Sequence, residues 1–148
     1  MYEPKPAADD EHGGPEMAPG WACRACHAGQ DFLGQNPGGR LAAADQLNQF
    51  MGTVFRAPHE KDLCAPQLGL SGQVEILDMN GRVSARIPFG ADGNFNGNTP
   101  AGMPSPYRAK VVTAGGERMM QKGQTNGDCN TCHTVEGREG APGRITLP

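Results

Sequence analysis

The sequence has few of the large apolar residues that normally fill a protein core. Leu, Ile, Val and Phe account for 22 of its 148 residues, or about 15%, whereas ordinary globular chains exceed roughly 20%. Aromatic residues make up only 5%, while Gly occurs 22 times and Pro 13 times. A chain of this length suits one domain. A domain that cannot build its interior from side chains alone needs disulfides, a metal or a large cofactor.

Other absences exclude whole classes of function. No segment approaches the ~20 apolar residues that cross a bilayer, so we expect no membrane span. The sequence has no basic block and no aromatic residues interleaved with Lys or Arg, so we expect no nucleic-acid partner. The formal net charge is only -3, which argues against a wholly disordered chain.

The cysteines that are present fall into two similar short motifs. These are "CRACH", with Cys23, Cys26 and His27, and "CNTCH", with Cys129, Cys132 and His133. In the pattern Cys-x-x-Cys-His, the two thiols form thioether bonds with the vinyl groups of a haem, and the adjacent His binds the iron. The motifs use four of the five Cys and two of the four His. The sequence therefore predicts two covalently bound c-type haems, which would also supply the missing apolar interior.

Paired cysteines have two other common uses in proteins. Two Cys-x-x-Cys pairs can form a four-cysteine zinc site, but zinc needs no His after each pair. A disulfide framework or a thioredoxin-like redox pair fits less well, because each motif lies in a Gly-rich loop and not near a βαβ pattern. Haem attachment is the interpretation that uses the two cysteines and the histidine of each motif.

An iron that only carries electrons needs a second axial ligand. His12 and His59 are the two histidines outside the motifs, so one prediction is bis-histidine ligation at both haems. Methionine is the competing ligand, because Met17, Met119 and Met120 each precede a motif, and Met raises the reduction potential relative to His. An iron left open would instead favour a small haem enzyme, a peroxidase or reductase, which is the alternative function.

The chain divides into an arm and a single domain. The expected parts are an extended arm over residues 1–20 and a dihaem domain over 21–148, with a first haem segment at 21–40, a β region at 50–118 and a second haem segment at 119–148. The arm is rich in Pro and has no apolar periodicity. If His12 on this arm binds the haem of a neighbouring subunit, the subunits would form a head-to-tail filament.

Short strands are expected between the motifs. Alternating apolar residues over 72–89 surround Asn80-Gly81, which predicts a hairpin whose two turn residues both have positive φ. "FMGTVF" predicts a strand after a short helix over 40–49, and 107–114 predicts another strand. We expect these strands to form an antiparallel meander. The predicted fold class is mainly β with much irregular structure: a small antiparallel β-sandwich flanked by the two haem segments.

A long Gly-rich and Asn-rich loop is expected over residues 90–106. Within it, Asp92, Asn94 and Asn96, followed by Gly97, match the first half of an EF-hand calcium loop. The second half fails, because the bidentate Glu would fall at Met103. The sequence favours simple turns over a calcium site here.

With both motifs placed, the chain resembles secreted multihaem c-type cytochromes. Its last part, "GDCNTCHTVEGREGAPGRITLP", is similar to a C-terminal haem segment found in proteins whose middle resembles the β-sandwich of carboxypeptidase-regulatory-like domains, here roughly residues 50–118. The resemblance implies that His27 and His133 are the proximal iron ligands and that the four motif cysteines carry the thioether bonds.

The same resemblance implies a cellular role. It implies export to the periplasm or the extracellular space, with a signal segment removed, and electron transfer with redox partner proteins. Small extracellular cytochromes that polymerise into conductive filaments are also similar in haem density, which makes a homo-polymer a further expectation. Cys64 would then be the odd thiol, either buried or in an intermolecular disulfide.

Overall fold

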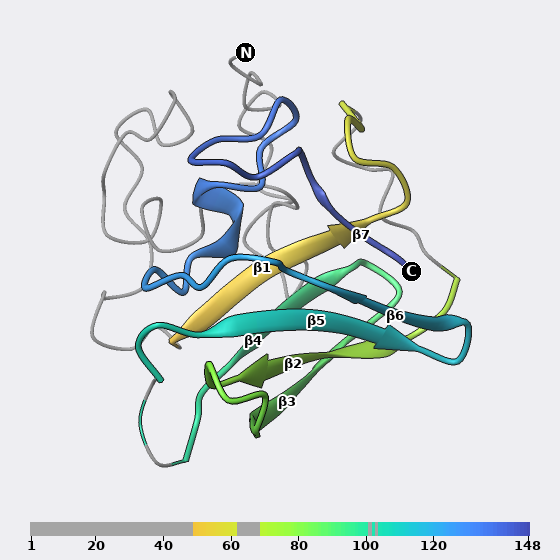
Figure 1. The fold of residues 1–148 in the computed structure, drawn as a ribbon. Coiled ribbons are helices and arrows are strands. Elements are labelled where there is room, and N and C mark those ends of the chain that lie inside the picture. The colour runs from red at the N-terminus through yellow and green to blue at the C-terminus, as the bar shows by residue number, and fades with distance from the viewer. Residues whose placement is uncertain (1–48, 62–68, 101, 103) are drawn as a thin grey trace, which may run out of the picture.

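The computed structural model describes residues 49–61, 69–100, 102 and 104–148. This part of the chain is mainly β, as predicted: its strands form two sheets, and it contains no α-helix (Figure 1). The strands and the one 3-10 helix are β1 (Phe50–Phe55), β2 (Gly72–Leu77), β3 (Val83–Phe89), β4 (Asn94–Gly97), β5 (Arg108–Thr113), β6 (Gly116–Met119), η3 (Cys129–Thr131) and β7 (Ile145–Thr146). The strand orders are β4-β1-β7 and β3-β2-β5-β6.

The strand predicted at "FMGTVF" is confirmed as β1, which is buried along its whole length. It pairs antiparallel with β4 and parallel with β7, so the antiparallel arrangement predicted from the sequence holds for every described strand pairing except β1–β7. The prediction of a continuous loop over 90–106 is wrong, because it contains β4. Phe95 is the single apolar side chain of β4, and one apolar residue is too little for a visible alternation in the sequence.

The hairpin predicted over 72–89 is confirmed as β2 and β3, but its turn differs from the prediction. Gly81 has a φ of 84°, and Asn80 does not share a positive φ. The carboxylate of Asp78 accepts the N–H groups of Asn80 and Arg82, both at 2.9 Å, and the Gly81 N–H donates to the Asp78 carbonyl at 3.1 Å. The Asp78 side chain therefore holds a turn followed by one left-handed Gly, in place of the predicted two-residue turn.

The strand predicted over 107–114 is confirmed as β5, but the strands do not follow one another as a simple meander. β5 pairs with β2, on the opposite side from β3. Between β3 and β5 the chain crosses to the other sheet and forms β4. The helix predicted over 40–49 lies almost wholly outside the described residues, as do the arm and the first haem segment.

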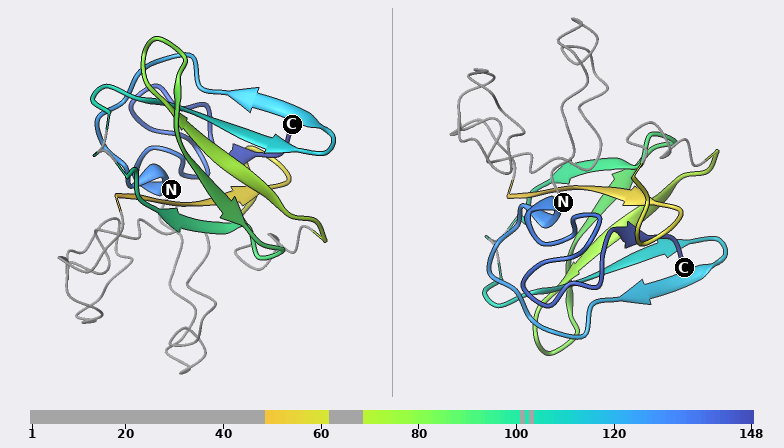
Figure 2. Two further views of the ribbon diagram at one scale, coloured as in Figure 1. Left: turned by 90° about the horizontal axis from the view of Figure 1, so that it is seen from below. Right: turned by 90° about the horizontal axis from the view of Figure 1, so that it is seen from above.

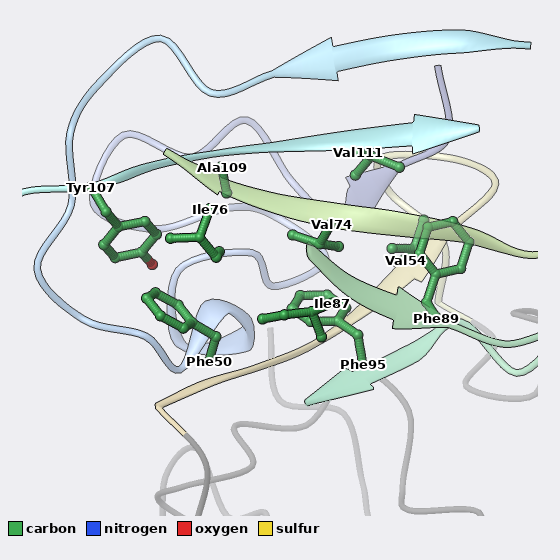
Figure 3. Close-up of a cluster of buried hydrophobic side chains, with 10 residues drawn as sticks. All are labelled: Phe50, Val54, Val74, Ile76, Ile87, Phe89, Phe95, Tyr107, Ala109 and Val111. Carbon is green, nitrogen blue, oxygen red and sulfur yellow. The ribbon is translucent and has the colours of Figure 1, made fainter. Parts of the chain in front are cut away.

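The core is one apolar cluster to which both sheets contribute (Figure 3). Its buried members are Phe50, Val54, Val74, Ile76, Ile87, Phe89, Phe95, Tyr107, Ala109 and Val111. The rings of Phe50 and Tyr107 meet edge to face, with centroids 4.9 Å apart and planes at 80°. The Tyr107 hydroxyl donates to the Asn126 carbonyl at 2.6 Å, so this buried phenol has the partner that burial requires.

The segment after β6 returns across the molecule to η3. From η3 the chain loops back to β7, which ends beside β1 (Figure 1). Seen from above, η3 and the loop that follows it lie beside β1, on the same side as β5 and β6 (Figure 2). This arrangement brings the second cysteine motif against the apolar cluster, on which Cys129 packs.

Candidate functional site

The second cysteine motif lies on a single helical turn. The backbone N–H groups of Cys132 and His133 donate to the Cys129 carbonyl, at 3.2 and 2.9 Å. Residues three and four positions apart lie on the same side of a helical turn. The side chains of Cys129, Cys132 and His133 therefore face one region, and all three line the same cavity.

Asn130, between the two cysteines, attaches this turn to β1. Its buried side chain accepts the Thr53 backbone N–H at 3.1 Å and donates to the Thr53 hydroxyl at 3.1 Å. The Thr53 hydroxyl in turn donates to the Asn94 side chain at 2.7 Å, and the Met51 N–H donates to the Gly127 carbonyl at 3.0 Å. The motif does not predict this role, because it leaves the two residues between its cysteines unspecified.

The imidazole of His133 is oriented by the C-terminal loop. Its Nδ1 lies 2.8 Å from the Gly143 carbonyl oxygen, and since a carbonyl only accepts, Nδ1 carries the proton and donates. In the neutral ring the lone pair is then on Nε2. Burial lowers the pKa of His133, and the weaker effect of the bond to Gly143 opposes it. A neutral imidazole whose other nitrogen donates to a carbonyl is the usual state of a metal-binding histidine.

The position of Gly143 is fixed by its neighbour Arg144. The Arg144 N–H donates to the Pro58 carbonyl at 2.7 Å, its Nε donates to the Glu60 carbonyl at 3.2 Å, and its guanidinium lies 4.6 Å from the centre of the Phe55 ring. Gly143 itself has a φ of 147°, and a Cβ there would overlap the Pro58 carbonyl. The carbonyl that orients His133 is therefore held by contacts to the chain that follows β1.

A cavity of about 530 Å³ lies beside the motif, within the 300–1,000 Å³ typical of small-molecule and cofactor sites. Its walls include apolar residues of the core, the cysteine motif, two methionines and several basic residues, namely Val74, Phe95, Ala109, Val111, Ile145; Cys129, Cys132, His133; Met119, Met120; and Lys110, Arg118, Lys122, Arg144. The space is large enough for a porphyrin-sized group, and Arg118 and Lys122 could pair with its carboxylates, although Asp128 and Glu139 also line the cavity.

The cysteines have the properties of thiols and not of thiolates. Cys129 and Cys132 are free. Burial, reinforced by the nearby Asp128 carboxylate, raises the pKa of Cys129 to about 12, and burial also raises the pKa of Cys132. Redox-active cysteine pairs need the opposite, a lowered pKa. The raised pKa values of Cys129 and Cys132 therefore give no support to a thioredoxin-like pair.

A zinc site also lacks support in this part of the chain. Among the described residues, no three His, Cys, Asp or Glu side chains are placed to hold one metal ion. A zinc ion needs four converging ligands. A four-cysteine site would therefore depend on Cys23 and Cys26, which lie outside the described residues.

The other predicted ligands are not brought to this cavity. His59 is exposed, its Nδ1 donates to the Val135 carbonyl at 2.7 Å, and it does not line the cavity, although its neighbour Pro58 does. A role for His59 as an iron ligand therefore stays a prediction. It would concern an iron other than the one proposed beside His133. Six other residues singled out in the sequence lie outside the described part of the chain: His12, Met17, Cys23, Cys26, His27 and Cys64.

Residues 92–97, which match half of a calcium loop, begin with a turn, and Asn94 joins them to Thr53 of β1. The Asp92 carboxylate accepts the Asn94 backbone N–H at 3.1 Å, and the Asn94 side-chain oxygen accepts the Thr53 hydroxyl. One oxygen of Asp92 and the side-chain oxygen of Asn94 are thus used inside the protein, which agrees with the preference for turns drawn from the sequence.

Comparisons with known proteins add no family. The chain matched no protein-family model, no curated protein and no solved structure. In the part of the chain that the structure describes, no helix is long and apolar enough to cross a membrane.

Proposed function

We propose that this protein is an exported dihaem c-type cytochrome that transfers electrons and does not catalyse a reaction of its own. One observation carries the proposal: Cys129, Cys132 and His133 face a cofactor-sized apolar cavity, and the Gly143 carbonyl fixes His133 with its Nε2 lone pair free of that bond. The residues present fit a covalently attached haem better than they fit zinc or a redox thiol pair. The first motif is proposed to hold a second haem in the same way.

Each part of the site has a distinct task. Cys129 and Cys132 would hold the porphyrin through thioether bonds, and His133 would bind iron through Nε2. Val74, Ala109 and Val111, on the inner face of the four-stranded sheet, exclude water from that wall of the cavity. The haem supplies one-electron exchange between ferric and ferrous iron when it is bound.

The finer parts of the proposal follow from the sequence. The two sheets are proposed to be a small sandwich flanked by two haem segments, in the periplasm or outside the cell, exchanging electrons with redox partner proteins. Self-assembly into a filament belongs to the same proposal. The basic residues that line the cavity support haem binding, because they suit the carboxylates of a porphyrin.

The test is the mass of the intact, denatured protein, expressed with a signal segment in a host that attaches haem to exported proteins. We expect an excess equal to two haem groups that persists in denaturant, because thioether bonds are covalent. A mass equal to the polypeptide alone would contradict the proposal. A mass with one haem would confine haem attachment to one of the two motifs, and digestion into peptides would then identify that motif.

The alternative, a small haem enzyme, predicts an iron with an open coordination position. Carbon monoxide added to the ferrous protein separates the two functions. A pure electron carrier has both irons six-coordinate and binds carbon monoxide slowly and incompletely. Rapid binding of one equivalent would favour the enzyme.

A further inference from the structure

The cavity that the motif lines is also lined by two adjacent methionines, Met119 and Met120, and the strand pairing shows that they face opposite ways. In the β5–β6 ladder, Met119 is paired with Lys110. Paired residues of an antiparallel ladder point to the same face of the sheet. Lys110 lies on the polar face, where its ammonium group is 3.5 Å from the Glu75 carboxylate. Met119 therefore belongs to the polar face, and it is 41% exposed.

Met120 belongs to the inner face. Its backbone N–H donates to the Ala109 carbonyl at 2.9 Å, which continues the ladder one residue beyond β6. Ala109 is a buried member of the apolar cluster, and the Met120 side chain packs against that cluster. Both methionines line the cavity, but only Met120 is on the apolar face of the sheet, packed against the core.

The cavity offers few other ligands for a second axial position. His133 is the only histidine that lines it among the described residues, and His59 does not reach it. Cys129 and Cys132 are committed to the porphyrin in the proposed function. A thioether on an unbranched side chain with three rotatable bonds adapts readily to a nearby iron.

We infer that Met120 is the second axial ligand of the haem attached at Cys129 and Cys132, with His133 as the first. This inference rests on the proposed function. It assigns a His/Met pair to this iron and so a higher reduction potential than a bis-histidine iron would have. It also places the sixth ligand directly after β6 and the fifth just after η3, so that bound haem would join the two segments.

The test is proton NMR of the reduced, haem-loaded full chain, in which the methyl group of a methionine bound to ferrous iron is strongly shifted upfield by the porphyrin ring current. The variant Met120→Leu removes the sulfur and nearly conserves the volume, a change that cores usually tolerate. Met119→Leu is the matched control. The intact mass of each protein is measured first.

We expect the wild type to show an upfield methyl resonance that Met120→Leu abolishes and Met119→Leu keeps. We also expect Met120→Leu, with both haems retained, to bind one equivalent of carbon monoxide rapidly. Loss of the resonance in Met119→Leu alone, its survival in both variants, or its absence from the wild type would each overturn the assignment. An absence of covalent haem from the wild type would instead refute the proposed function, so the two failures are distinguishable.

Discussion

The Nδ1 atom of His133 lies 2.8 Å from the carbonyl oxygen of Gly143. This bond joins the cysteine motif to a loop ten residues further along the chain, and the loop is itself bonded to the segment after β1 through Arg144. The orientation of the proposed iron ligand thus depends on backbone contacts made far from the motif. Changes in that loop should alter the iron site without touching Cys129, Cys132 or His133.

Gly143→Ala should disturb the site through this bond. The residue has a φ of 147° and no room for a Cβ beside Pro58, so we expect a loss of about 1–3 kcal/mol of stability. The Gly143 carbonyl should move away from His133. Because His133 then loses the bond that orients it, we expect the intact mass to show a smaller fraction of chains with two haems. Gly81→Ala is the control, because Gly81 also has a positive φ but nothing within 4 Å. Equal haem content in the two variants would contradict the role of Gly143.

Asn130→Ala should loosen the motif from β1. It removes both hydrogen bonds between Asn130 and Thr53, and loss of such buried partners costs about 1–3 kcal/mol. We expect a lower midpoint of thermal unfolding, followed by circular dichroism, and a fall in haem content. Asn80→Ala, in the exposed β2–β3 turn, should change neither. An unaltered midpoint in Asn130→Ala would show that the turn is held in another way.

Replacement of both Cys129 and Cys132 by Ser should remove one haem of the two. The reason is that each motif is proposed to form its thioether bonds independently. The absorbance of the haem per polypeptide should fall to about half, and Cys64→Ser should leave it unchanged, because the proposed function gives Cys64 no bond to haem. A full haem complement in the double variant would disprove attachment at the second motif.

The sequence predicts the motif residues of the proposed haem site, but it does not predict the contacts that hold them in place. Spacing alone makes Cys129, Cys132 and His133 candidate haem-binding residues, because thioether bonds and an iron ligand would impose that spacing. Gly143 and Asn130 are not identified in this way, because they act through backbone and amide contacts that only the folded chain creates. Choosing between Met119 and Met120 likewise required the register of β5 and β6, which the sequence does not show.

The fold was predictable where alternation was strong. The β2–β3 hairpin and β5 have clear apolar periodicity, and β1 is a run of β-forming residues. β4 and β7 are short strands that offer little pattern of their own, and they form because β1 presents two edges to pair with. The predicted Asn-Gly turn failed because the Asp78 carboxylate, outside the turn dipeptide, caps the backbone and selects a different turn.

The most direct measurement counts the thiols that a cysteine reagent labels in the fully denatured and reduced protein. Thioether bonds survive both treatments, whereas zinc ligands and disulfides do not. With four of the five cysteines bound to haem, we predict one label per chain, on Cys64. Five labels would show that no cysteine is bonded to a porphyrin and would contradict the central claim.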